Sequence, residues 1–575
     1  MATVSIRHRL TKVLESTLAR LRASGAITGE VPVIQLTPPK DPQHGDFASN
    51  IAMILAKSAK RNPREVATLI QNEVGNGDSL LDKVEVAGPG FINFRVTNKA
   101  VLESFAEALT AGDQFVRSQH GAGEKVLVEF VSANPTGPLH LGHGRGAVVG
   151  DTVASLLEAA GYDVKREYYI NDLGNQTDVM ARSVHLRYSE LHGRPLNAPE
   201  EFYPGDYIID IARAVQAEHG DKLLDAPESE WLEGIKARGI GLMMKRIKED
   251  LAGFNVRFDS FVSERELSER VGLSGYVERL GKLGHTFVED GKTWFRSTTF
   301  GDDKDRVIIR EDGRPTYITA DMAYHEDKLE RGFVKLIDVL GADHGGYVPR
   351  VRAGIAAVGL DPNALDVILI QIVSISRGGE AVRMGKRLGT AVWLREVLDQ
   401  VGPDAFRYFF IMRRSDAQMD FDLELATKKT LDNPVFYAQM GHARMCAIVR
   451  KAAEQGITIP KYEPGILDAL TLPEEIALIK TMLRAPEIVI DAALAREPHQ
   501  VVHFIQELIA QFHSYYSQYK GTERVVSSDL RKTNARLLLC EGLRTTLYAL
   551  LEILGVSAPE RMSLDDVSYE ESSKG

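Results

Sequence analysis

Residues 126–150 read VLVEFVSANPTGPLHLGHGRGAVVG, and this stretch decides the fold. Its apolar start has the length and the β-branched content of a buried strand, and a turn punctuated by proline and glycine follows at residues 134–138. A helical pattern of apolar residues begins after the tetrapeptide HLGH at residues 140–143. A strand, a tight glycine turn and a helix aim backbone N–H groups and a helix dipole at a phosphate. The stretch therefore predicts the start of a nucleotide-binding sheet.

The two imidazoles of this stretch, His140 and His143, can donate hydrogen bonds to phosphate oxygens, and Gly142 lets a flat adenine ring approach the backbone. H-x-G-H alone is short enough to arise by chance in an ordinary helix cap. The longer run ANPTGPLHLGHGR resembles the first signature of class I aminoacyl-tRNA synthetases, and the lead-in EFVSANPTGP is similar to arginyl-tRNA synthetases in particular. This resemblance implies an α/β fold: a Rossmann-type parallel-sheet catalytic domain with a connective insertion, an N-terminal α/β tRNA-binding module and a C-terminal α-helical bundle.

Length and composition are those of a soluble protein with several domains. The 575 residues suffice for about three to five domains, and 44% hydrophobic and 26% charged residues are ordinary values for globular proteins. Only two cysteines, Cys446 and Cys540, are present, which excludes a disulfide framework and a cysteine-type zinc cluster and indicates a reducing compartment. Because no apolar run approaches a membrane span and no signal core is visible, we expect a cytoplasmic protein.

The net charge of −11 argues weakly against a nucleic-acid partner, which usually binds a basic surface. Net charge is a sum, however, and a basic face can coexist with acidic surface elsewhere. Composition therefore leaves RNA binding open.

Residues 1–112 are expected to form a separate α/β module. Helical periodicity begins at Ile6, a short strand is expected over residues 31–36, two further helices follow, and residues 84–96 predict a hairpin. In this hairpin an exposed Phe91 beside Asn93 could stack on and read an unpaired base, although the pattern alone more often describes a strand with one buried aromatic. The module resembles the domain of arginyl-tRNA synthetases that binds the tRNA elbow, which implies that Phe91 and Asn93 contact a D-loop base.

Residues 120–430 are expected to hold the catalytic sheet, interrupted by an insertion over about 185–305. The expected strands are residues 126–131, 163–170, 305–310, 335–340 and 367–376. The run YYINDLGNQ at residues 168–176 is again close to the arginyl family. The insertion is mostly helical and charged, with a hairpin candidate at residues 288–292. It shows no metal-ligand pair and no nucleophile elbow, so an editing site is not expected.

A basic loop, Arg383-Met384-Gly385-Lys386-Arg387, follows the last expected strand. Cations around glycines suit a clamp over a triphosphate, whereas a solvated basic turn is the alternative for the loop by itself. H-x-G-H after the first strand and a basic M-x-K-R loop after the last resemble the paired signature of class I synthetases, whose second motif is K-M-S-K-R. This chain departs from that motif at Arg383 and Gly385 but keeps Lys386, the lysine that the family pattern places at the pyrophosphate. Since glycine adds loop freedom, closure is expected to rely more on bound tRNA.

Residues 431–562 are expected to be helical. The expected helices are residues 433–453, 473–495, 498–519 and 528–554. NPVFYAQMGHARMCAIVRKA and GVSAPERM resemble the two ends of the anticodon-binding domain of arginyl-tRNA synthetases. Residues 563–575 are acidic and polar and are expected to be a disordered tail.

The resemblance implies an arginine–tRNA ligase reaction of protein biosynthesis. ATP, which brings Mg²⁺, would be attacked at its α-phosphorus by the carboxylate of L-arginine to give arginyl-adenylate and pyrophosphate. The 3′-terminal adenosine of tRNA for arginine would then take the arginyl group, with tRNA expected to be required for activation. No tightly bound cofactor and no protein metal site are expected, and a monomer fits the family. The expected catalytic residues are His140, His143, Lys386 and Arg387, and the expected ATP-binding residues are His140, Gly142, His143, His344, Met384 and Lys386.

Recognition of arginine calls for carboxylates, because a planar guanidinium takes paired hydrogen bonds that the point charge of lysine cannot reproduce. Asp321 is the first choice and Glu129 the second. Tyr317, four residues before Asp321, would share one helix face with it and supply a wall or a hydroxyl. The family pattern also implies three further contacts to substrate arginine, from Ser132, Asn134 and Tyr347.

Two other functions remain open from the sequence. One is a class I ligase that adenylates a different amino or carboxylic acid; the N-terminal module and the carboxylate pair argue against it. A non-catalytic RNA-binding paralogue would be expected to have lost signature residues, yet His140, His143 and Lys386 are present.

Overall fold

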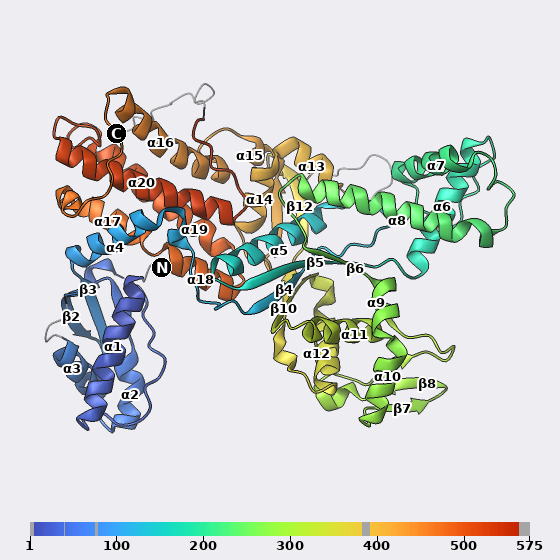
Figure 1. Ribbon diagram of the computed structural model, residues 1–575, viewed down its shortest axis with the longest axis horizontal. Coiled ribbons are helices and arrows are strands. Elements are labelled where there is room, and N and C mark those ends of the chain that lie inside the picture. The colour runs from blue at the N-terminus through green and yellow to red at the C-terminus, as the bar shows by residue number, and fades with distance from the viewer. Residues whose placement is uncertain (1–4, 40, 75–78, 382–391, 563–575) are drawn as a thin grey trace.

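The structure is a computed structural model that describes residues 5–39, 41–74, 79–381 and 392–562. A central parallel sheet lies between an N-terminal module, a helical insertion and a C-terminal helical domain (Figure 1). None of the helices in these ranges is long and apolar enough to cross a bilayer.

The N-terminal module packs helices against a three-stranded antiparallel sheet of order β1-β3-β2. Its elements are α1 (Ile6–Ala23), β1 (Phe47–Ser49), α2 (Ile51–Ala59), α3 (Pro63–Val74), β2 (Leu81–Ala87), β3 (Phe91–Val96) and α4 (Asn98–Ala111). The predicted hairpin is present as β2 and β3. The predicted strand over residues 31–36 is wrong: none of these residues pairs with a strand, and an isolated bridge to Ala48 forms only at the next residue, Thr37. Pro32 and Pro38 explain the difference, because proline has no N–H to donate to a ladder.

The central sheet has five parallel strands in the order β11-β10-β4-β5-β6. They are β4 (Lys125–Glu129), β5 (Asp163–Ile170), β6 (Ser260–Ser263), β10 (Lys335–Gly341) and β11 (Leu365–Ile370). The first strand in sequence, β4, lies between β5 and β10, so the chain turns in opposite directions on its two sides. Crevices at the carboxyl ends of strands at such a switch point are the usual ligand sites of open α/β sheets. The expected Rossmann-type sheet is confirmed.

Three strand predictions need correction. β9 (Arg306–Ile309) does not continue the parallel sheet but pairs with β8 (Lys292–Phe295) and, through it, with β7 (Thr286–Glu289). The single strand expected over residues 367–376 is two strands, β11 and β12 (Val373–Arg377), and β12 pairs instead with β13 (Glu380–Ala381) and β14 (Met419–Asp422). β6, which falls inside the expected insertion, is an edge strand of the central sheet. A short apolar run indicates a strand but does not show which segment pairs with it. The sheet to which each of these strands belongs therefore could not be predicted from the run itself.

The insertion and the catalytic region also contribute helices. They are α5 (Leu141–Ala159), α6 (Asn175–Leu191), α7 (Asp206–His219), α8 (Glu228–Ala252), α9 (Glu264–Val271), α10 (Leu273–Lys282), α11 (Tyr317–Glu330) and α12 (Val348–Ala357). α6, α7 and α8 form a separate core that extends to the right in Figure 1.

Between the central sheet and residue 431 lie α13 (Leu394–Val401), α14 (Pro403–Ile411) and α15 (Leu423–Thr427). Residues 431–562 are helical, as expected, with α16 (Pro434–Glu454), α17 (Pro473–Met482), α18 (Ala485–Ala495), α19 (His499–Tyr519) and α20 (Leu530–Ile553). The helix expected over residues 473–495 is two helices. Pro486 lies in the first turn of α18, where its missing N–H costs nothing, whereas inside one long helix it would break the hydrogen-bond pattern.

Arg407 of α14 ties the catalytic and C-terminal parts together. It is fully buried, and its guanidinium donates to the Asp151 carboxylate of α5 at 2.7 Å and to the carbonyl oxygens of Leu554 at 2.9 Å and Phe254 at 3.1 Å. A buried charge needs such partners, because an unpaired one costs several kcal/mol. The end of α20 is thereby fixed against the helix that begins at the HLGH tetrapeptide.

Candidate functional site

In the HLGH turn each histidine ring accepts a hydrogen bond from the backbone of the other histidine. His140 is the N-cap of α5, its Nδ1 accepts from the backbone N–H of His143 at 3.4 Å, and Nδ1 of His143 accepts from the N–H of His140 at 3.3 Å. The rings stack with centroids 3.6 Å apart. Because each Nδ1 is an acceptor, the proton of each neutral ring lies on Nε2. The local sequence therefore produces two Nε2–H donors at the positive end of a helix.

Burial keeps these donors uncharged. It lowers the pKa of His140, and it lowers the pKa of His143 to about 3, with the neighbouring His140 adding to the effect. At neutral pH both rings are neutral hydrogen-bond donors, which can contact a phosphate without forming a strong ion pair. Gly142 lies against the pair: a Cβ on this residue would be 3.1 Å from Cε1 and Nδ1 of His140, so any side chain here would press on the ring.

A short backbone bridge joins this turn to the chain after the predicted basic loop. His140 pairs with Trp393: the N–H of Leu141 donates to the Val392 carbonyl at 3.0 Å, and that of Leu394 to the Leu139 carbonyl at 2.9 Å. The predicted loop residues Arg383, Met384, Gly385, Lys386 and Arg387 lie outside the described residues.

The end of β4 holds Glu129 in a fixed geometry. β4 stops at Glu129, and Val131 and Ser132 follow with φ of +67° and +39°, in the left-handed region that is costly for a β-branched residue. This turn brings the Ser132 hydroxyl back to Glu129, where Oγ donates to Oε1 at 2.9 Å, and the N–H of Tyr169 donates to the same Oγ at 3.1 Å. The strained backbone thus places Ser132 and Glu129 together at the carboxyl edge of the sheet.

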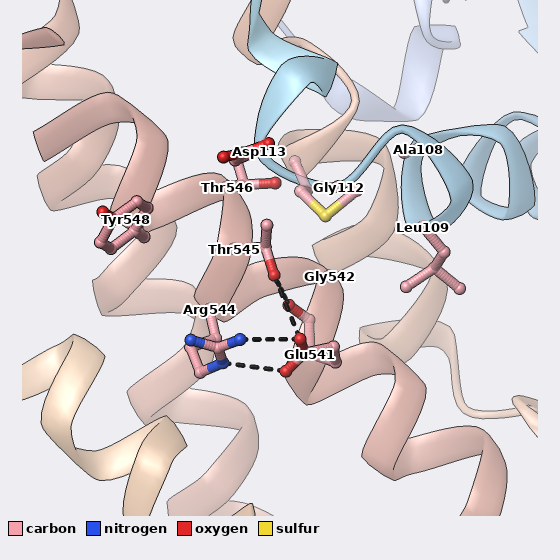
Figure 2. A pocket seen from close by; sticks show the side chains of 11 residues that line it. Ala108, Leu109, Gly112, Asp113, Glu541, Gly542, Arg544, Thr545, Thr546 and Tyr548 are labelled. Atoms are coloured by element: carbon pink, nitrogen blue, oxygen red, sulfur yellow. Dashed lines mark hydrogen bonds and ion pairs between the residues drawn. The ribbon is translucent and has the colours of Figure 1, made fainter. Parts of the chain in front are cut away.

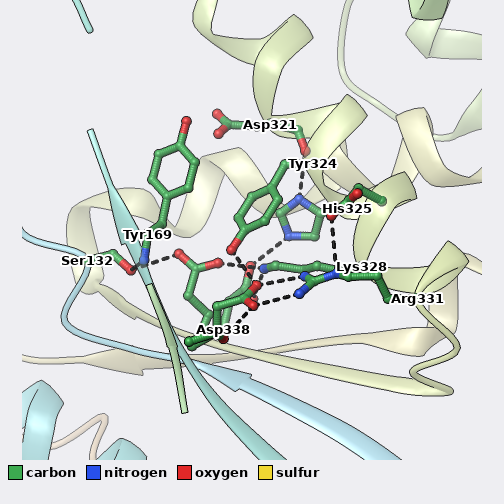
Figure 3. A network of polar contacts seen from close by, with 12 residues as sticks. Ser132, Tyr169, Asp321, Tyr324, His325, Lys328, Arg331 and Asp338 are labelled. Atoms are coloured by element: carbon green, nitrogen blue, oxygen red, sulfur yellow. Dashed lines mark hydrogen bonds and ion pairs between the residues drawn. The ribbon is translucent and has the colours of Figure 1, made fainter. Parts of the chain in front are cut away.

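Glu129 belongs to a buried network that α11 closes from above (Figure 3). Lys328, fully buried, donates to Glu129 Oε2 at 2.6 Å and to Asp338 Oδ1 at 3.1 Å. His325 contacts Asp338 Oδ2 through Nε2 at 2.8 Å and the carbonyl oxygen of Asp321 through Nδ1 at 2.7 Å. His325 thus contacts both neighbours through its two ring nitrogens. Lys328 shares its charge between the Glu129 and Asp338 carboxylates, and this cation balances part of their negative charge.

The charge balance is visible in Asp338. Burial opposes its ionisation, but Lys328 and His325 outweigh that cost and hold the pKa of Asp338 below its usual range. Neither Lys328 nor Asp338 was singled out from the sequence. The signal was present: Asp338 is a charged residue in the middle of the buried strand KLIDVLG.

Asp321 lies outside this balance. It is on α11 one turn after Tyr317, as the spacing predicted, and its Oδ2 accepts a hydrogen bond from the Tyr347 hydroxyl. Burial raises the pKa of Asp321 to about 7, the negative charges of Glu129 and Asp338 also raise it, and His325 and Lys328 oppose the rise. Among the described side chains no cation donates a hydrogen bond to the Asp321 carboxylate, whereas Lys328 donates to Glu129. A bound guanidinium would supply the missing charge.

Glu264 is a second carboxyl group with a raised pKa, and it was not predicted from the sequence. It is the first residue of α9, is 7% exposed, and its Oε2 lies 2.8 Å from the side-chain amide of Asn171. Burial, Asp321 and Asp172 raise its pKa to about 7. It follows the edge strand β6, which was not expected to belong to the sheet, and its place at the crevice was therefore not recognised.

The remaining predicted residues differ in exposure. Tyr317 is 61% exposed at the start of α11. His344 lies in the 3₁₀ helix of residues Ala342–Tyr347 with its ring largely in solvent, and Asn134 donates to the Gln176 side chain at 2.6 Å. On β3 of the N-terminal module, Phe91 is 41% exposed, as a base-stacking role requires and contrary to the buried aromatic that the pattern alone favoured, whereas Asn93 is only 7% exposed. β3, which carries both residues, lies in the N-terminal module, away from β4, β5 and β10 of the central sheet (Figure 1).

A separate hollow of about 300 Å³ lies where α4 meets α20 (Figure 2). Glu541 and Arg544 line it and pair with each other at 2.7 and 2.8 Å. None of the predicted site residues lines this hollow. Because its two central charges are already paired, it offers much less to a phosphate or a guanidinium than the crevice does.

Across the described residues no three His, Cys, Asp or Glu side chains gather closely enough to hold a metal ion. Both cysteines are free thiols.

Comparison with protein families gives matches over nearly the whole chain. The models described as arginyl tRNA synthetase N terminal domain, tRNA synthetases class I (R), catalytic domain, and DALR anticodon binding domain match residues 5–96, 104–446 and 438–562. The arginine–tRNA ligase of Syntrophotalea carbinolica is 50% identical over 535 residues, 93% of this chain and 96% of that protein. That of Anoxybacillus flavithermus is 46% identical over 545 residues, 95% and 97% of the two chains.

Solved structures of synthetases are also similar to this chain. A putative arginyl-tRNA synthetase from Campylobacter jejuni has a TM-score of 0.73 at 33% identity and covers 81% of this chain and 100% of its own. The arginyl-tRNA synthetase of Thermus thermophilus has a TM-score of 0.75 at 22% identity, covering 97% and 100%, and shares the fold.

Proposed function

The chain belongs to the arginyl-tRNA synthetase family, and we propose that it is an arginine–tRNA ligase that activates L-arginine with ATP and transfers it to the 3′-terminal adenosine of its tRNA. One observation carries the proposal: a neutral pair of histidine donors and a half-buried carboxylate, Asp321, to which no described cationic side chain donates, belong to the same edge of the central sheet. The first suits a polyphosphate and the second a guanidinium.

In the first step a carboxylate oxygen of arginine bonds to the α-phosphorus of ATP, and the bond to the bridging oxygen of pyrophosphate breaks. Such chemistry depends on positioning and on stabilisation of charge. His140 and His143 would donate from Nε2 to phosphate oxygens, with Gly142 beneath the adenine and His344 beside the nucleotide. Lys386 and Arg387, with Met384 in the same loop, would neutralise the leaving pyrophosphate. Mg²⁺ would be held by the phosphate oxygens of ATP itself.

Arginine would lie between α11 and the end of β4. Asp321, oriented by the Tyr347 hydroxyl, would take the guanidinium, and Glu129, fixed by Lys328 and Ser132, would add a second acceptor. Tyr317 would form the exposed wall of the pocket. Ser132 and Asn134 would face the α-amino and carboxylate groups of the substrate.

In the second step a terminal ribose hydroxyl of tRNA attacks the carbonyl carbon of arginyl-adenylate and AMP leaves. We propose that residues 1–112 bind the tRNA elbow, with the exposed Phe91 as the stacking contact and the buried Asn93 beneath it in the same strand. Residues 120–430 would perform catalysis, and residues 431–562 would bind the anticodon arm. Activation would require bound tRNA. We also infer a monomer that works in the cytoplasm, which the two free thiols favour.

Arginine-dependent exchange of pyrophosphate into ATP, with and without tRNA for arginine, tests this function. Asp321→Asn should raise the arginine KM about 10- to 100-fold, since a hydrogen bond to a charged group contributes about 1.5–3 kcal/mol. Glu330→Gln, at an exposed carboxylate on the same helix, is the matched control and should leave the KM unchanged. An unaltered arginine KM in Asp321→Asn would refute the assignment of Asp321. Absence of exchange in folded wild-type protein, with tRNA present, would refute the ligase.

A further inference from the structure

Tyr207 belongs to the helical insertion but lies against the ATP signature. It is in the first turn of α7 and 9% exposed. Its hydroxyl lies over Gly137 in the turn between β4 and the HLGH tetrapeptide, where a Cβ on Gly137 would be 3.1 Å from the phenolic oxygen. The insertion therefore packs directly on the turn that leads to His140.

The other side of the Tyr207 ring meets Trp393. The two rings are perpendicular, at 82°, with centroids 6.3 Å apart, a favourable edge-to-face arrangement. Trp393 is the residue whose backbone bridges His140, flanked by the hydrogen bonds Leu141 N–H to Val392 and Leu394 N–H to Leu139. One aromatic side chain thus contacts both segments that define the position of His140.

Gly205 makes this placement possible. A Cβ at Gly205 would lie 2.3 Å from Cε1 of Tyr207, so the ring could not keep its position beside any residue with a side chain. Gly205 has φ of −65°, a value open to every residue, and the requirement is therefore steric and not conformational. Glycine is therefore needed at position 205 because it leaves room for the Tyr207 ring, and not because the backbone has an unusual conformation.

We propose that Tyr207 is a positioning residue for ATP: by bracing Gly137 and Trp393 it fixes the turn from which His140 and His143 donate to the phosphates. This inference rests on the proposed function of the histidine pair. The turn over residues 134–139 lies outside the sheet ladder, so its geometry depends on what packs against it. Rate losses of about 10- to 100-fold follow from displacements of catalytic groups by about 1 Å, which a lost aromatic brace would permit.

Three variants test the inference in pyrophosphate exchange with tRNA present. Tyr207→Leu should raise the ATP KM or lower kcat by about 10- to 100-fold while the arginine KM stays within about twofold, because Asp321 lies on a different element. Gly205→Ala keeps the tyrosine but displaces its ring, and should show the same split. The double variant should be no worse than either single one, since both act through one contact. Tyr207→Phe, which keeps the ring, should recover most of the activity.

Tyr188→Leu is the control for a purely structural loss. Tyr188 is fully buried in the core of the same insertion, and its hydroxyl donates to the Gly220 carbonyl at 2.7 Å. This variant should lower the melting temperature and leave the ATP KM and kcat close to wild type. Equal effects of Tyr188→Leu and Tyr207→Leu, or normal ATP kinetics in Tyr207→Leu, would overturn the proposal for Tyr207. Absence of exchange in the wild type would instead refute the proposed function.

Discussion

Lowering the pH from 8 to 6 should raise the arginine KM about 10-fold. Burial raises the pKa of Asp321 to about 7, so the carboxyl group is about nine-tenths ionised at pH 8 and about one-tenth at pH 6. Arginine is a cation throughout this range and binds the ionised form, and its apparent affinity falls in proportion to the fraction of competent enzyme. Binding should therefore release a proton near neutral pH.

The pH dependence of the arginine KM also tests whether Glu264 must be ionised for arginine to bind. Its pKa is also raised to about 7, and the groups that face it are Tyr169, Asn171, Asp172 and Asp321. If ionisation of both carboxyl groups were needed for binding, the KM would change about 100-fold over the same two pH units. Glu264→Gln removes a negative charge near Asp321, so the inflection of the KM profile should move to lower pH. Asp321→Asn should remove the dependence that belongs to Asp321.

The assay is pyrophosphate exchange at fixed tRNA and saturating ATP, with the arginine KM measured from pH 6 to pH 8. Thermal unfolding gives a second readout. The folded-state pKa of Asp321 lies above its ordinary value of 3.8, so this group makes the ligand-free protein less stable as the pH rises from about 4 to 7. Arginine should therefore raise the melting temperature more at pH 8 than at pH 6. An arginine KM that is flat across this range in the wild type would refute the reasoning.

Two further predictions concern the network and the tRNA module. Lys328→Met leaves Glu129 and Asp338 without their shared cation and should lower the free energy of unfolding by about 3–5 kcal/mol, measured by denaturant titration, whereas Lys328→Met combined with Asp338→Asn should recover part of the loss. A single variant as stable as wild type would contradict the charge balance. Phe91→Ser should raise the tRNA KM in aminoacylation by about 10-fold, the loss of one stacked base, and leave the arginine KM unchanged; an unaffected tRNA KM would remove Phe91 from the interface.

The sequence predicted what is encoded locally. The strand, turn and helix over residues 126–150 depend on neighbours in the chain, and so does the spacing of Tyr317 and Asp321 on one helix face. Family membership and fold follow from these motifs and are confirmed. Strand partners are set by distant segments, and for that reason β9 was assigned to the wrong sheet. The edge strand β6 was missed for the same reason, and with it Glu264.

The difference between the two predicted arginine carboxylates lies in their neighbours and not in their residue type. Glu129 shares Lys328 with Asp338, and Asp338 also contacts His325, so Glu129 has a cationic partner before any ligand arrives. The Asp321 carboxylate accepts a hydrogen bond from the Tyr347 hydroxyl but from no described cation, and burial raises its pKa. A cationic substrate gains most where a negative charge is buried and uncompensated. We therefore expect Asp321 to select for the positive charge of the substrate. Glu129, which already has Lys328 as a cationic partner, would instead orient the guanidinium.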